Sequence, residues 1–139
     1  MRVLLSIKPV HVENILQGIK TFEFRRRIFA RRDINTVLIY CTRPVGRLIG
    51  EFDIADILED EPEALWASTR LGSGISKAFF DAYFAGRSRA YALQIGNLRV
   101  FEEPIVPSDW FDNFSPPQSY MYVPPMETRS ASLNQLEMF

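Results

Sequence analysis

The chain is poor in the residues that build covalent or metal-held sites. Its 139 residues include a single cysteine, Cys41, and a single histidine, His11. A lone cysteine excludes an intrachain disulfide, and the two residues together are too few for an ordinary zinc site. A Ser-His-Asp or Cys-His catalytic arrangement would have to use His11, and its neighbours do not support one. We expect His11 at the surface near the start of a helix, and we expect neither a metal nor a cofactor.

Long apolar segments are also missing. No run is long enough to span a bilayer, and the apolar stretch at residues 1–7 is too short for a secretory signal. No glycine-rich phosphate loop or nucleotide fingerprint is present. With 47% hydrophobic and 24% charged residues, the composition is typical of a globular protein of one domain. We expect a cytoplasmic protein with no membrane partner, and the sequence leaves its oligomeric state open.

Charge is present in abundance but is unevenly spread. The net charge is −1, yet residues 1–50 carry ten Lys and Arg against three Asp and Glu. The remaining residues carry six basic and fourteen acidic side chains. A chain with no overall basicity can still present a basic face, so we expect any anion-binding surface to be N-terminal.

Apolar periodicity predicts an α+β domain. Helices are expected to begin at Pro9, Pro62 and Ser76, and Gly50 to mark a bulge or bend. The segments with strand character are residues 2–7, 21–27, 36–42, 47–58, 90–96, 97–102 and 116–123, of which 97–102 either continues or pairs with the strand before it. This order argues for a curled sheet and against a doubly wound parallel one. Residues 126–139 are polar without a sustained period, which predicts a domain at 1–125 and a flexible C-terminal tail at 126–139.

The basic stretch at residues 18–27 is the segment around which we expect the chain to be organised. In a strand, side chains alternate between the two faces. Phe22 and Phe24 therefore point one way, toward a core, while Glu23 and Arg25 point the other way. Lys20 stands where the strand begins. The pattern predicts an acid and bases side by side on one face.

Several short motifs occur in the order found in a known family. The pattern Gly18-x-Lys20-x-x-Glu23-x-Arg25 between a short helix and a strand resembles the ASCH domain, a branch of the PUA-like superfamily. Further segments resemble a subgroup of that family described as predicted transcriptional regulators: Ser6-x-Lys8-Pro9, Gly74-Ile75-Ser76, Phe79-Phe80-x-x-Tyr83-Phe84-x-Gly86, Ala90-Tyr91-Ala92-Leu93 and Pro116-Pro117-Gln118-Ser119-Tyr120. The resemblance covers about residues 3–123.

The resemblance implies a fold and a place for a ligand. It implies a small PUA-like β-barrel of about five or six strands with two to three flanking helices and a cleft beside the first helix. Relatives of this fold bind RNA or modified bases. A fold does not by itself determine chemistry, so the function has to be argued from the residues of the site.

Our first hypothesis is a nucleic-acid or nucleotide-binding module with RNA or a nucleotide-like ligand as its partner. In such a cleft Lys8, Lys20 and Arg25 contact phosphates. Glu23 either accepts hydrogen bonds from a base edge or holds Arg25 in position. The remaining candidate ligand-binding residues are Gln118 and Ser119, which are suited to base edges, and Tyr120 or Tyr122, which are suited to stacking on an unpaired base.

Two alternatives stay open at this point. Some ASCH proteins are amidohydrolases that act on acetylated cytidine, with a lysine, a threonine and a glutamate in the active site. Lys20 takes the place of that lysine as a catalytic residue, but Glu23 stands three residues further on where the resemblance implies threonine. Lys20 activating a hydroxyl or water, with Glu23 as acid or base, would suit either this hydrolysis or a ribonuclease. The other alternative is a regulatory domain that recognises a small ligand.

Overall fold

The structure is a computed structural model that describes residues 1–125, so the predicted tail at 126–139 lies outside the described residues. The strands are β1 (Arg2–Ile7), β2 (Phe22–Arg25), β3 (Thr36–Cys41), β4 (Arg47–Asp60), β5 (Ala90–Ile105) and β6 (Tyr120–Val123). The helices are α1 (Pro9–Leu16), α2 (Pro62–Thr69) and α3 (Lys77–Tyr83), with short 3-10 turns at Arg70–Gly72 and Pro107–Asp109. None of the helices in this part of the chain is both long and apolar enough to cross a membrane.

The strands form one sheet in the order β2-β5-β4-β3-β1-β6. β1 and β3 run parallel, and the other neighbouring pairs are antiparallel. No strand pairing among the described residues joins the two edge strands, β2 and β6, so the sheet is curled but open. The predicted α+β class, with its six strands and flanking helices, is confirmed.

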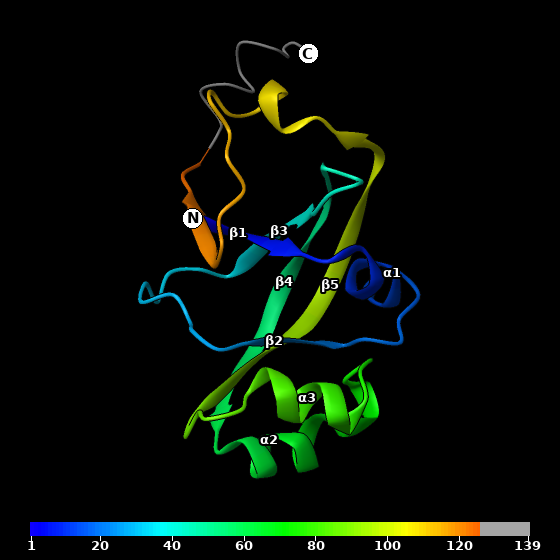
Figure 1. Cartoon of the computed structure of the whole chain (residues 1–139). Coiled ribbons are helices and arrows are strands. Elements are labelled where there is room, and N and C mark those ends of the chain that lie inside the picture. Colours follow the sequence, from blue (N-terminus) through cyan, green and yellow to red (C-terminus); the bar gives the residue numbers. More distant parts are fainter. Residues whose placement is uncertain (126–139) are drawn as a thin grey trace.

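Two long strands run through the length of the sheet. β4 and β5 have 14 and 16 residues and extend from the upper part of Figure 1 to the helices α2 and α3 at its lower end. The register of β4 shifts between Leu48 and Gly50, where a bulge or bend was predicted. A Cβ atom added at Gly50 would clash with the carbonyl of Arg99, so the two strands approach too closely there for any side chain. Residues 97–102 continue β5, which is one of the two predicted alternatives.

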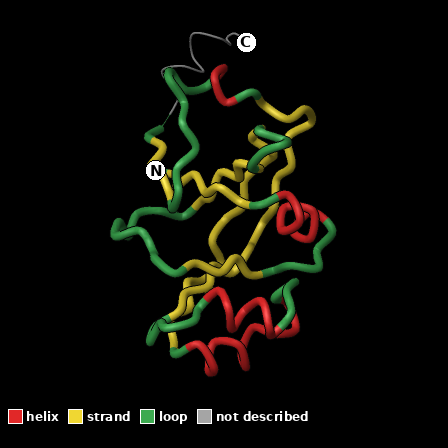
Figure 2. Tube along the Cα trace, in the orientation of Figure 1, coloured by secondary structure: helices red, strands yellow, loops and turns green. Residues whose placement is uncertain are grey.

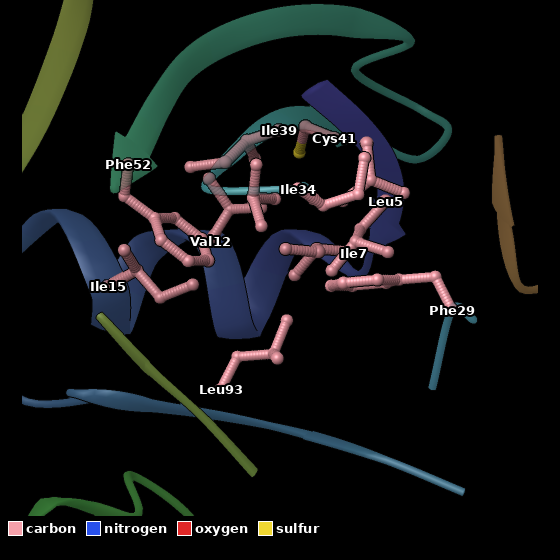
Figure 3. Packing of buried hydrophobic residues seen from close by; sticks show 12 residues of the cluster. Leu5, Ile7, Val12, Ile15, Phe29, Ile34, Ile39, Cys41, Phe52 and Leu93 are labelled. Carbon is pink, nitrogen blue, oxygen red and sulfur yellow. The ribbon is translucent and has the colours of Figure 1, made fainter. Parts of the chain in front are cut away.

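The main core lies between α1 and the inner face of the sheet. Val12 and Ile15 are buried on one side of α1 and pack with side chains of β1, β3, β4 and β5 (Figure 3). Their spacing of three residues places both on one helix face, as the sequence pattern predicts. α1 is thereby held across the end of β1, which fixes where the chain enters β2.

A second core joins β2 to the helix pair α2 and α3, which lies at the other end of the sheet from β6 (Figure 2). Phe24 of β2 packs edge-on against Phe80, with ring centroids 5.3 Å apart, and Phe80 packs against Phe84 one turn later. The hydroxyl of Ser76 accepts a hydrogen bond from the backbone N–H of Phe79 at 3.1 Å, which confirms the predicted N-cap of α3. The phenyl ring of Phe24 therefore faces a packed core, as alternation along the strand predicts.

Candidate functional site

A cleft of about 460 Å³ opens where β1, α1, β2 and α3 meet. Five of the seven residues predicted to bind a ligand line it: Lys8, Lys20, Glu23, Arg25 and Gln118. The other two, Ser119 and Tyr120, line a separate hollow of about 490 Å³ next to it. The structure thus brings together residues from three distant parts of the sequence, and it divides the predicted set between two neighbouring concave surfaces.

Glu23 and Arg25 form an ion pair at the wall of the cleft. Arg25 Nη1 donates to Glu23 Oε2 at 3.2 Å, and the two side chains are only 12% and 7% exposed. Arg25 Nη2 also donates to the backbone carbonyl of Ser119 at 2.7 Å. This second bond connects the edge strand β2 to the segment that leads into β6, the other edge. Arg25 is therefore an anchored cation that spans the open side of the sheet.

Lys20 lies at the base of the cleft with 3% of its surface exposed. Its Nζ donates to the carbonyl of Ser73 at 2.9 Å and lies 4.8 Å from the centre of the Phe24 ring, a distance at which an ammonium is attracted to the face of the ring. Burial lowers the pKa of Lys20 from its ordinary value, and the negative charge of Glu23 opposes that change. A lysine with a lowered pKa loses its proton at a lower pH than a surface lysine does.

The loop between α2 and α3 fixes the position of Lys20. Gly74 has a φ of +67°, and a Cβ atom added there would lie 2.6 Å from the Cβ of Lys20. The backbone N–H of Thr21 donates to the carbonyl of Gly72 at 2.8 Å, and the Thr21 hydroxyl is directed to the same carbonyl at 3.3 Å. Thr21 does not line the cleft. Glycine at position 74 is required by both its backbone conformation and this close approach.

His11 lines the cleft, so the expectation that it is an ordinary surface residue is wrong. Its ring is half-buried and packs edge-on against Phe79, with centroids 5.4 Å apart. Its Nδ1 is buried without a hydrogen-bond partner among the described residues. Burial and the neighbouring charge of Lys20 lower the pKa of His11. Sequence reasoning placed the residue correctly on the first turn of α1, but only the packing of α3 against that turn encloses it.

Aromatic residues of α3 form the remaining wall, and the predicted set of ligand-binding residues did not include them. The rings of Phe79 and Tyr83 stack with centroids 6.4 Å apart, and both line the cleft. Arg26 lies over the ring of Tyr83 at 4.2 Å and donates from Nε to its backbone carbonyl at 2.7 Å. The signal that identifies this wall is their spacing of four residues beside the more deeply buried Phe80 and Phe84.

Positive charge exceeds negative charge around the cleft. Glu23 is the single acid of its lining, against four basic residues: Lys8, Lys20, Arg25 and Arg26. Between residues 1 and 125 there is no group of three or more His, Cys, Asp or Glu side chains arranged to hold a metal ion. The arrangement is suited to a ligand that carries negative charge and offers a flat ring to the aromatic wall.

Comparisons with known proteins place the chain among related sequences and structures. Residues 5–102 match the family model of the ASCH domain. An ASCH domain-containing ribonuclease from Zymomonas mobilis is 30% identical over 132 residues, which cover 91% of this chain and 86% of that protein. Ribosomal protein uL22 from Ureaplasma parvum is 25% identical over 102 residues, which cover 73% of this chain and 33% of that protein.

A solved structure is similar over nearly the whole chain. The crystal structure of ASCH from Zymomonas mobilis has a TM-score of 0.84 and 29% sequence identity, and the match covers 96% of this chain and 94% of that one. The shared fold supports the α+β, PUA-like class predicted from the sequence motifs.

Proposed function

The chain belongs to the ASCH domain family, and from this premise we propose that it binds RNA by seating one unpaired nucleotide in the cleft. The observation that carries the proposal is the composition of the cleft, in which four basic side chains and a single carboxylate face an aromatic wall. Phosphate contacts supply most of the affinity of nucleic-acid binding, and stacking on aromatic rings binds unpaired bases without regard to sequence.

Each group in the cleft has a role that suits this ligand. Lys8 is exposed at its mouth and supplies a mobile phosphate contact. Arg25 is already anchored by Glu23 and Ser119, so it offers a fixed positive charge. Arg25 donates to Oε2 of the Glu23 carboxylate, and in the proposed complex Oε1 accepts a hydrogen bond from an amino or imino group of a base edge. Gln118 adds an amide that both donates and accepts.

The size of the cleft favours a single unpaired nucleotide. Its volume of about 460 Å³ lies within the range of pockets that hold small organic ligands. A duplex keeps its bases stacked inside, whereas recognition of single-stranded RNA depends on bases that can leave the stack. RNA is also the more suitable ligand because the relatives described above are a ribonuclease and a ribosomal protein.

Salt titration of Lys8→Ala tests the binding proposal. Lys8 is exposed and makes no side-chain hydrogen bond within residues 1–125, so its loss should leave the fold intact. We expect weaker binding of a fluorescent oligouridylate in anisotropy titrations, and a slope of log K against log salt that is smaller by about 0.7 for the lost phosphate contact. Arg99→Ala is the matched control, because it removes one positive charge from a residue that does not line the cleft. Equal behaviour of the two variants would refute the proposal.

A second candidate function is cleavage of the bound RNA. The observation that favours it is the presence of buried Lys20, with its lowered pKa, in the same cleft as Glu23. Glu23 would accept the proton of a ribose 2′-hydroxyl as its oxygen attacks the adjoining phosphorus, and the Lys20 ammonium would give a proton to the departing 5′-oxygen. The products would be a 2′,3′-cyclic phosphate and a 5′-hydroxyl end.

The products of RNA incubation test the cleavage candidate. Lys20→Met keeps an unbranched side chain that is one atom shorter and removes its charge, and Glu23→Gln preserves the shape of the carboxylate. We expect wild-type protein to produce cyclic phosphate ends, and both variants to lower the cleavage rate by a factor of at least 100, which is typical for the loss of an acid or base. Circular dichroism of each variant establishes that it is folded. Wild-type protein that leaves RNA intact while binding it would exclude cleavage and leave the binding module.

The other predictions from the family resemblance have less support. Hydrolysis of an acetylated nucleoside by the amidohydrolase pattern needs a threonine near the lysine, and Thr21 is directed to the carbonyl of Gly72 outside the cleft. Recognition of a small regulatory ligand, membership of the subgroup of predicted transcriptional regulators and a cytoplasmic location stay predictions. The relatives described above do not carry the regulator description.

A further inference from the structure

The hollow beside the cleft is strongly basic. It has a volume of about 490 Å³, and its wall includes three arginines, Arg26, Arg27 and Arg87, but no acidic residue. We call this surface the arginine hollow. Arg27 and Arg87 are exposed, and neither forms a salt bridge with any residue between 1 and 125. Three arginines around one hollow, with no acidic residue in its wall, favour the binding of an anion there.

The arginine hollow adjoins the cleft, because the two surfaces share one lining residue and are lined elsewhere by consecutive residues. Arg26 lines both surfaces, and the consecutive residues Gln118 and Ser119 line the cleft and the hollow respectively. Arg25, which lines the cleft, donates to the carbonyl of Ser119, which lines the hollow, so this hydrogen bond joins the two walls. A chain of nucleotides can therefore pass from one surface to the other, because consecutive residues after β2 and before β6 line first the cleft and then the hollow.

We propose that the arginine hollow binds the backbone phosphate adjoining the nucleotide that the cleft holds, so that the two surfaces form one continuous site for single-stranded RNA. The proposal rests on the RNA-binding function of the cleft. Guanidinium groups bind phosphate with paired hydrogen bonds, and several of them around one hollow match the oxygens of a phosphodiester. Arg26, which borders both surfaces, contacts the nucleotide on each side of this phosphate.

The aromatic residues of the hollow support a nucleotide as its occupant in preference to a free anion. Tyr91 and Tyr120 are both half-buried and line it together with the arginines. Tyr120 packs against Phe29 and Tyr122, with ring centroids 6.1 and 5.4 Å away, so its ring is held in place. A fixed ring next to a phosphate site gives a ribose or a base a surface to lie on. This arrangement gives Tyr120, predicted from the sequence to stack, a place outside the cleft.

Binding of RNA of different lengths to an Arg27→Ala/Arg87→Ala variant tests the proposal. The ligands are uridine, which carries no phosphate, and a hexauridylate with hydroxyl ends, which carries only internal phosphodiesters. We expect the variant to bind uridine as the wild type does, to bind the hexauridylate about tenfold more weakly at low salt, and to show a salt slope smaller by about 0.7 for one shared phosphate. Arg89→Ala is the matched control, because Arg89 is exposed nearby but is paired with Glu59 at 3.3 Å.

The outcomes separate this inference from the function on which it rests. If Lys8→Ala weakens hexauridylate binding and the double arginine variant does not, the arginine hollow has no role and the cleft keeps its own. If neither Lys8→Ala nor the double arginine variant changes binding, both the RNA-binding function and the inference that rests on it are wrong. Inorganic phosphate added as a competitor distinguishes a third case: if it binds the hollow and the double variant loses only that binding, the site is for a free anion and the proposal is wrong.

Discussion

Two clusters of charged residues on this molecule use the same side chains in opposite ways. On the long strands, Arg99 donates two bonds to Asp53 and one to Glu51, and Arg2 pairs with the other oxygen of Glu51 at 3.1 Å. We call these four residues the strand network. The lining of the cleft has four basic residues and a single carboxylate, that of Glu23, which pairs with Arg25. The strand network is balanced, with two arginines and two acids, whereas the cleft retains positive charge.

Concavity and burial separate the two clusters further. The residues of the strand network lie on β1, β4 and β5. They are partly exposed, and none of them lines the cleft or the arginine hollow. The hydrogen bonds of the strand network lower the pKa of Asp53, which is the expected effect of a bound guanidinium. The ion pair of Glu23 and Arg25 is more deeply buried and borders a cavity. A count of arginines in the sequence does not distinguish these cases, because the number of nearby carboxylates and the shape of the surface decide which cluster attracts an anion.

The largest expected effect on stability comes from breaking the buried pair. Arg25→Met leaves the Glu23 carboxylate without its partner in a site that is largely closed to water, and we expect the free energy of unfolding to fall by about 3 kcal/mol. Urea denaturation followed by circular dichroism measures it. The double change Glu23→Gln/Arg25→Met removes the uncompensated charge and should recover most of the loss. A double variant less stable than Arg25→Met would show that Glu23 is stable there without a partner.

A smaller effect is expected from the same substitution in the strand network. Arg99→Met removes three hydrogen bonds to carboxylates, but the side chains involved remain in contact with solvent. We expect the free energy of unfolding to fall by no more than about 1 kcal/mol, with a loss that shrinks as salt is added. RNA affinity should be unchanged. Denaturation at low and high salt measures the first effect and anisotropy the second, and a loss as large as that of Arg25→Met would remove the contrast between the clusters.

The smallest expected effect is a pH dependence of stability due to His11. Its pKa in the folded protein is lowered from 6.5 by burial and by the charges of Lys20 and Lys8, while Glu23 opposes the shift. As the pH falls below 6.5, the unfolded chain therefore binds the proton more readily than the folded one, and the free energy of unfolding falls. His11→Gln removes this contribution. Denaturation at pH 7.5 and 5.5 should show a larger drop for the wild type than for the variant, and equal drops would contradict the assignment.

The positions of the central charged residues followed from local pattern, and their partners did not. Alternation along residues 22–25 correctly places the Phe24 ring in a packed core, because the faces of a strand follow from its backbone, but Phe24 also borders the cleft that Glu23 and Arg25 line. The prediction of a strand over 21–27 was too long at both ends, since β2 spans Phe22–Arg25. The strand predicted at 116–123 is likewise reduced to Tyr120–Val123. Strand ends depend on which neighbour supplies hydrogen bonds, and those neighbours are remote in the sequence.

The features of the site likewise fall into those that local sequence predicted and those that depend on distant contacts. The basic half of the chain, the core-facing ring of Phe24 and the motifs of the family were readable in the order of the amino acids, because charge, alternation and turn residues act over a few positions. The enclosure of His11 by α3, the anchoring of Arg25 on the Ser119 carbonyl and the separation of Tyr120 from the cleft depend on contacts between residues as many as 94 positions apart. Only the packing of the helices and the open edge of the sheet determines those contacts, because no local propensity specifies which distant surfaces meet.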